Sequence, residues 1–178
     1  MAWETLKQSL LADISKLIDR RASAEHRDDL HRLSDVFFGR FAAEDLRLRS
    51  AENLYGLLYG LLRFLDPWRG DSVKIGLRNP SISSHGWESK ATVISILCRD
   101  MPFCTASVRG EINQRNLAIH CVESCNLRVR RGPAGELLEL LDVDAEGPEV
   151  SHESLLYFEI SRHTNLEELH ELRDTLVE

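Results

Sequence analysis

The sequence predicts an α+β protein in which N-terminal helices precede a βαββαβ sandwich whose last strand is missing. Two observations lead to this prediction. Apolar residues recur at helical spacing as far as Leu65. From residue 71 onward, β-branched or alternating runs are separated by segments of helical spacing. We therefore expect a helical region over residues 1–70 and a sandwich domain over residues 71–178, truncated at its C-terminal end.

The first region is expected to contain helices with one apolar face each, which must be buried against a neighbour. Ser23 and Ser50 are suitable N-caps, and Asp66-Pro67 ends the last helix. Gly56 and Gly60 lie in that helix, where their missing side chains would let another element approach closely. The predicted helices cover residues 1–21, 23–38 and 50–65.

The second region alternates between strand and helix signals. The run over residues 117–130 has strict period two with one largely apolar face, which is typical of a strand covered on one side. Strands are expected at residues 73–77, 91–98, 117–130, 136–143 and 155–160, and helices at residues 104–116 and 164–178. Without a last strand, the apolar strand 91–98 would have a bare edge. We expect that edge either to recruit a second copy or to be covered by residues 73–77.

The most informative local feature is the turn between the strand 91–98 and the helix that follows it. Pro102 suits a helix start, and the unpaired N–H groups there could bind the carboxylate of an amino acid. The alternative interpretation is a plain turn in which Asp100 caps the helix. Phe103 is expected to insert under the sheet, and Asn116 to end the helix in a left-handed conformation.

Composition narrows the classes of function. A net charge of -7 with a pI near 5.5 argues against nucleic acid as the main partner. No apolar run approaches the roughly twenty residues of a membrane helix, so no membrane association is expected. The start of the chain lacks the pattern of a signal peptide, so we expect the protein to be located in the cytoplasm.

No residue pattern indicates catalysis or a metal within this chain. No G-x-G-x-x-G follows a strand, so no cofactor is expected to bind here. The cysteines form no CxxC pair and are expected to be buried thiols that act as small hydrophobes. They are Cys98, Cys104, Cys121 and Cys125.

A series of short motifs follows in a set order and spacing. They are Asn79-Pro80, His85-Gly86-Trp87, Thr92-Val93, Asp100-Met101-Pro102-Phe103, Ser107-Val108, Glu111-Ile112-Asn113 and Ile119-His120. These motifs resemble the N-terminal portion of the large bacterial NAD-specific glutamate dehydrogenase. Asn53-Leu54-Tyr55-Gly56 resembles the family segment that precedes them. Ala106 and Ser124 depart from the family, which tends to have an Asp and a second His at those positions.

The resemblance implies an ACT-like (ferredoxin-like) sandwich of the kind that binds amino-acid effectors or pairs with copies of itself. It also implies that the NAD-binding catalytic domain lies downstream. The residues it offers for an effector or interface corner are Arg99, Asp100, Met101, Pro102, Phe103, Asn113 and His120.

Three functions follow as hypotheses. The first is a non-catalytic regulatory or oligomerisation domain, with other domains of its parent dehydrogenase and further copies of itself as partners. The second is a stand-alone ACT-type module that binds an amino-acid effector. The third, an independent enzyme, has no nucleophile–base spacing to support it.

Overall fold

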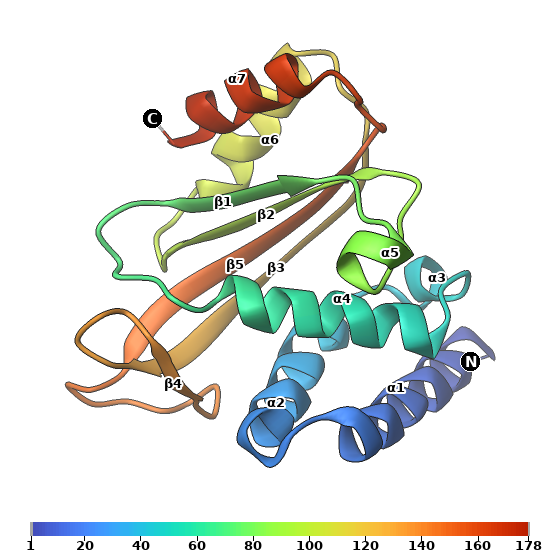
Figure 1. Ribbon diagram of the computed structural model, residues 1–178, viewed down its shortest axis with the longest axis vertical. Coiled ribbons are helices and arrows are strands. Elements are labelled where there is room, and N and C mark those ends of the chain that lie inside the picture. The colour runs from blue at the N-terminus through green and yellow to red at the C-terminus, as the bar shows by residue number, and fades with distance from the viewer. Residues whose placement is uncertain (1, 178) are drawn as a thin grey trace.

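The protein is described here by a computed structural model covering residues 2–177, an α+β fold built on one antiparallel sheet (Figure 1). Met1 and Glu178, where the predicted first and last helices begin and end, lie outside the described residues. The elements are α1 (Ala2–Arg21), α2 (Ala24–Arg40), α3 (Ala43–Leu46), α4 (Ala51–Phe64), β1 (Lys74–Arg78), α5 (Ile82–His85), β2 (Thr92–Arg99), α6 (Cys104–Gln114), β3 (Ile119–Arg131), β4 (Leu137–Leu140), β5 (Ser151–Ile160) and α7 (Leu166–Val177).

The strands follow the order β1-β2-β5-β3-β4, and every neighbouring pair is antiparallel. β2, α6, β3, β5 and α7 form the expected βαββα series. The edge of β2 that a last strand would occupy is covered by β1, in which Gly76 lies opposite Ser95. The α+β class is therefore confirmed, and β1, from the upstream segment, takes the place of a last strand at this edge.

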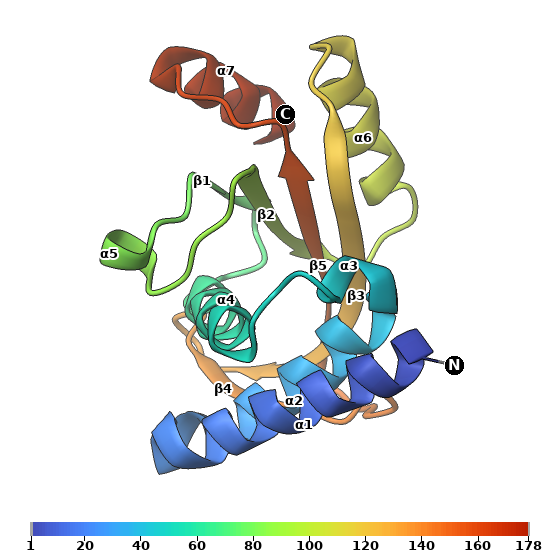
Figure 2. The same cartoon turned by 90° about the vertical axis from the view of Figure 1, so that its right-hand side faces the viewer.

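Helices cover both faces of the sheet (Figures 1 and 2). On β5, Leu155 and Tyr157 point to the face packed by α1, α2 and α4, whereas Leu156 and Phe158 point to the face packed by α6 and α7. This alternation follows from the two-residue period of a strand and explains why β5 is apolar nearly throughout.

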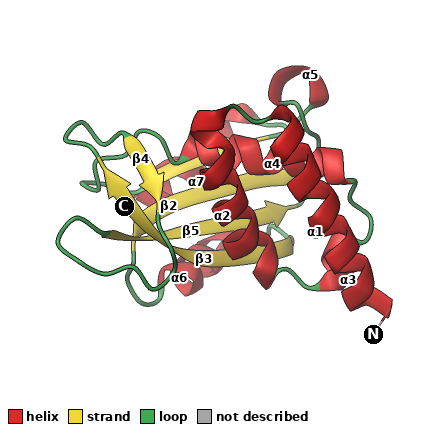
Figure 3. Cartoon of the chain, turned by 90° about the horizontal axis from the view of Figure 1, so that it is seen from below, coloured by secondary structure: helices red, strands yellow, loops and turns green. Residues whose placement is uncertain are grey.

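The larger core joins the N-terminal helices directly to the sheet. Phe37 of α2 lies edge-on against Tyr157 of β5, with ring centroids 5.4 Å apart. Leu58 of α4 and Leu97 of β2 belong to the same buried cluster. Figure 3 shows α2 and α4 lying across the strands. The predicted boundary between residues 70 and 71 stays a prediction, and the core extends across it.

Gly56 allows the close approach that the sequence predicts. A Cβ at Gly56 would lie 2.7 Å from the Gly86 carbonyl oxygen and 2.8 Å from the Trp87 Cβ. Trp87, from the His85-Gly86-Trp87 motif, is 3% exposed at this contact. The loop after α5 therefore packs directly on the backbone of α4.

We predict that Gly56→Ala lowers the free energy of unfolding by about 1–3 kcal/mol, because the added methyl group overpacks a contact that involves backbone. Gly39→Ala is the matched control. Gly39 also lies in a helix, but a Cβ there meets nothing within 4 Å, so alanine should stabilise by about 0.5–1 kcal/mol. Urea denaturation followed by tryptophan fluorescence measures both. Equal effects of the same sign would contradict this account of the packing.

Candidate functional site

Five of the predicted site residues are exposed and lead from β2 to α6. They are Arg99, the last residue of β2, and the turn 100–103, and together they are called the corner from here on (residues 99–103). The helix begins at Cys104, where the sequence predicts it, and Pro102 lies two residues before that start. Its N-cap position is held by Phe103, whose backbone is left-handed with φ 69° and ψ 2°. No side chain caps the helix, so the interpretation of Asp100 as a cap is wrong.

The corner is fixed by hydrogen bonds to segments distant in sequence. Arg99 Nε donates to the Gly70 carbonyl oxygen at 2.8 Å. The Asp100 N–H donates to the His152 carbonyl oxygen at 3.0 Å. The Asp100 carboxylate accepts a hydrogen bond from Ser154 Oγ at 3.3 Å. Asp100 thus anchors the corner to β5 instead of capping α6.

Phe103 does not insert under the sheet, and that prediction is wrong. Its side chain is 79% exposed, and Met101 beside it is 48% exposed. The apolar stripe of α6 already fills the space below the helix with Val108 and Ile112. Because left-handed backbone is unfavourable for a residue with a Cβ, Phe103 combines local strain with an exposed aromatic ring.

The remaining two predicted residues lie away from the corner. Asn113 is exposed near the other end of α6, and nine residues of helix from Cys104 span about 14 Å. His120 is exposed at the start of β3, where its Nε2 lies 3.1 Å from Ser161 Oγ. The structure therefore groups Arg99, Asp100, Met101, Pro102 and Phe103 but does not bring Asn113 and His120 to them.

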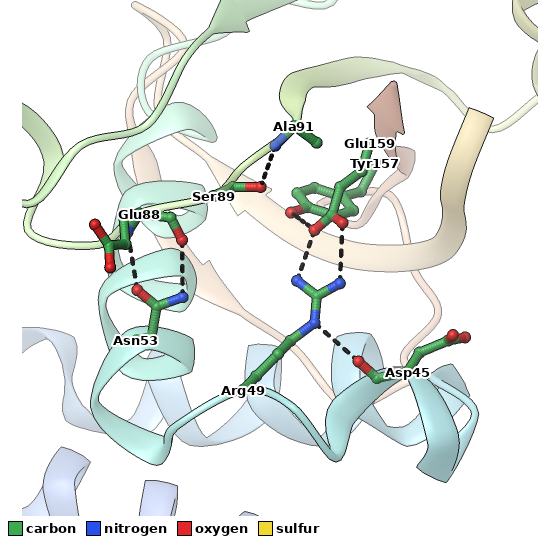
Figure 4. A network of polar contacts seen from close by, with 8 residues as sticks. All are labelled: Asp45, Arg49, Asn53, Glu88, Ser89, Ala91, Tyr157 and Glu159. Atoms are coloured by element: carbon green, nitrogen blue, oxygen red, sulfur yellow. Dashed lines mark hydrogen bonds and ion pairs between the residues drawn. The ribbon is translucent and has the colours of Figure 1, made fainter. Parts of the chain in front are cut away.

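A polar network that sequence reasoning missed lies beneath the N-terminal helices (Figure 4). Arg49, between α3 and α4, forms a bidentate ion pair with Glu159 of β5. Its Nη1 and Nη2 donate to Oε1 and Oε2 at 2.6 Å and 2.9 Å. The buried Tyr157 hydroxyl donates to the same carboxylate at 2.6 Å. Arg49 Nε donates to the Asp45 carbonyl oxygen at 2.9 Å. Both charged side chains are largely buried, 19% and 8% exposed.

Opposing effects set the charge state of Glu159. Burial by itself raises the pKa of this carboxyl, but the hydrogen bonds and charge of Arg49, with smaller contributions from Tyr157 and His120, lower it below its ordinary value. The pKa of Tyr157 is raised, first by burial and then by Glu159. Glu159 is therefore ionised at neutral pH and Tyr157 is a neutral hydrogen-bond donor.

Part of this network left a signal in the sequence. Glu159 is a lone carboxylate in the apolar run Leu155–Ile160, and a charge in a buried strand requires a partner. Nothing local indicates that the partner is Arg49, which is 110 residues away. A second pair joins Arg131 of β3 to the fully buried Glu153 of β5 at 2.7 Å, but Glu153 precedes the apolar run and gave no such signal.

Two cavities in the described part of the chain are too small for an effector. One, lined by Trp87, Arg78 and Phe64 among others, and another beside Arg32 and Leu140 each hold about 10 Å³, space for about one water molecule. Neither is lined by a corner residue. Residues 2–177 contain no group of three or more His, Cys, Asp or Glu arranged to hold a metal ion. Nor does that span include a helix that could cross a membrane.

The antiparallel sheet order, with α6 and α7 together on one face, is compatible with an ACT-like α+β fold. The comparisons with known proteins give the family. Residues 33–176 match the model of the glutamate dehydrogenase ACT1 domain, and the chain belongs to this family.

Two curated relatives are NAD-specific glutamate dehydrogenases. The protein from Pseudomonas aeruginosa is 35% identical over 145 residues, covering 82% of this chain and 9% of the relative. The protein from Halomonas elongata is 29% identical over 178 residues, covering 100% of this chain and 11% of the relative. The chain thus spans about a tenth of the length of these relatives. No solved structure matches it.

Several motif residues that carried the resemblance stabilise the fold. The Asn79 side chain accepts from Thr92 Oγ1 at 2.6 Å and donates to the His163 carbonyl oxygen at 2.9 Å, which joins β1, β2 and the segment before α7. The Asn53 side chain bonds both the N–H and the carbonyl of Glu88, at 2.8 Å and 3.0 Å (Figure 4). These contacts explain the motifs without a ligand.

Two substitutions at Phe103 separate the exposed ring from the strained backbone. Phe103→Ala should change the free energy of unfolding by less than about 0.5 kcal/mol, because the ring is exposed. Phe103→Gly should raise it by about 1 kcal/mol, because glycine has no Cβ to oppose a left-handed backbone. Urea denaturation measures both. A loss of about 3 kcal/mol in the alanine variant would mean that the ring is buried after all.

Proposed function

We propose that this chain is the non-catalytic N-terminal domain of an NAD-specific glutamate dehydrogenase, where it regulates or assembles the enzyme. The parent enzyme would oxidatively deaminate L-glutamate to 2-oxoglutarate and ammonia with NAD in the cytoplasm. Membership of the glutamate dehydrogenase ACT1 family and the names of both relatives support this proposal. NAD would bind in a downstream domain.

The observation that favours an assembly role is the form of the corner. Met101 and Phe103 expose their apolar side chains to solvent, and neither of the two small cavities described above is lined by a corner residue. Exposed aromatic and methionine side chains are enriched at the centre of protein interfaces. The corner therefore suits contact with a domain of a second subunit of the parent enzyme better than binding of an effector.

The sheet offers a route to pairing of copies. β3 pairs with β4 only over Val129–Arg131, while its pairing with β5 starts at Ile119. Among the described strands none pairs with residues 119–127 on the outer side of β3. Long strand edges of this kind recruit further strands, and a second copy of this chain would supply one.

The test uses the parent enzyme with Met101 and Phe103 both changed to Ser. If the corner is an interface, sedimentation should show smaller species or a shifted association equilibrium, and the rate of NAD reduction should change with it. Leu48→Ser is the matched control, because Leu48 is 88% exposed away from the corner. Unchanged sedimentation and unchanged kinetics in the double variant would contradict the assembly role.

A second measurement addresses catalysis and effector binding. Residues 1–178 alone, mixed with NAD and glutamate, should form no reduced cofactor. Turnover that persists through further purification would place chemistry in this domain. Calorimetric binding of a free amino acid to the same fragment would instead support the stand-alone effector module.

A further inference from the structure

Two thiols meet at the base of the corner. Cys98, near the end of β2, places its Sγ 3.6 Å from the Sγ of Cys104, the first residue of α6, and both are free cysteines. Cys98 is 2% exposed, whereas Cys104 is partly exposed. The expectation that all four cysteines are buried is therefore wrong for Cys104.

We propose that Cys98 and Cys104 form a modification site at which a low-molecular-mass disulfide converts the two thiols into one intramolecular disulfide. This goes beyond the proposed function and does not depend on it. A disulfide bond is about 2.05 Å long, so the sulfur atoms need to approach by only about 1.5 Å. The exposed corner between the two residues is the segment that would have to adjust.

The reaction takes two exchange steps. The Cys104 thiolate attacks one sulfur of the small disulfide, the S–S bond breaks, and one small thiol leaves after taking up a proton. Cys98 then loses its proton to solvent and attacks the Cys104 sulfur of the mixed disulfide, releasing the second small thiol. The protein dithiol is oxidised and the small disulfide is reduced to two thiols.

The environments of the two sulfurs support this order. The pKa of Cys98 is raised to about 12. Burial is the largest cause, and the neighbouring Cys104 thiol and Asp100 carboxylate add smaller contributions. Cys98 therefore stays protonated and shielded from external reagents. Cys104 meets the reagent first, and Cys98 is held where it can resolve the mixed disulfide.

The other two cysteines provide an internal comparison. Cys121 and Cys125 lie on one face of β3, where residues four apart are separated by about 13 Å. Both are buried in the core under the N-terminal helices. Cys121 and Cys125 are four residues apart in the sequence, and Cys98 and Cys104 are six apart. Although both separations are short, the sulfur atoms of Cys121 and Cys125 cannot come into contact in the folded chain.

The disulfide would enclose the corner in a short covalent ring. Arg99–Phe103, including the left-handed Phe103 and exposed Met101, all lie between the two cysteines. Oxidation would therefore restrict the same segment whose apolar side chains face solvent.

The test treats the reduced 178-residue chain with oxidised glutathione, blocks remaining thiols with N-ethylmaleimide, and digests with trypsin without reduction. Trypsin places Cys98 in peptide 91–99, Cys104 in peptide 100–109, and both Cys121 and Cys125 in peptide 116–128. The expected product is peptide 91–99 joined to peptide 100–109. It should exceed disulfide within peptide 116–128 by roughly tenfold or more, because exchange requires access and proximity.

Two variants and one condition serve as controls. Cys98→Ser should stop at a mixed disulfide with glutathione on Cys104, and Cys104→Ser should keep its thiols. In urea, where the fold no longer separates Cys121 from Cys125, the preference should disappear. A wild-type chain that accumulates the mixed disulfide, oxidises peptide 116–128 equally in the folded state, or does not react would overturn the proposal. If a variant does not fold, the disulfide-linked peptides of the wild-type chain still test the proposal.

Discussion

The buried ion pair between Arg49 and Glu159 is the constraint on which the rest of this structure depends. A buried carboxylate near the end of β5 is stable only with a partner, and a buried pair broken on one side costs about 3–5 kcal/mol. Arg49, in the segment between α3 and α4, is that partner and donates a hydrogen bond to each carboxylate oxygen of Glu159. The helices must therefore cover the sheet in one register, with Phe37 and Phe41 packed around Tyr157.

β5 is the strand through which the other parts are connected. It lies between β2 and β3 and is buried on both faces. Its Glu153 forms an ion pair with Arg131, and its Glu159 forms one with Arg49. Its backbone and Ser154 also anchor Asp100 at the corner. The corner is thus fixed at its base while Met101 and Phe103 remain exposed, which is consistent with a rigid platform that presents them to another surface.

How much of this could be predicted depended on the range of the interactions. The strand over residues 117–130 and the left-handed Asn116 follow from local patterns and were predicted correctly. The missing side chain of Gly56 predicted the close approach of another element, but not that this element is the loop with Gly86 and Trp87. The orientation of Phe103 was not predicted correctly, because it depends on a left-handed backbone that Pro102 did not indicate. The partner of Glu159 and the approach of Cys104 to Cys98 also required the folded chain. The prediction that Asn113 and His120 lie at the corner was wrong, because α6 separates both residues from it.

The most direct test measures the cost of Arg49→Met by urea denaturation as a function of pH. In the wild type the folded-state pKa of Glu159 lies below its ordinary value near 4.5, so its stabilisation is complete above that value and is lost as the pH falls through the folded pKa. Without Arg49, burial raises the pKa, and acid relieves the destabilisation by protonating Glu159. The cost should therefore be about 3–5 kcal/mol at neutral pH, begin to shrink as the pH falls through the raised pKa of Glu159 in the variant, and go on shrinking until the pH has fallen through the lowered pKa of the wild type. A cost below about 0.5 kcal/mol at pH 7, or one that does not change with pH, would contradict the account.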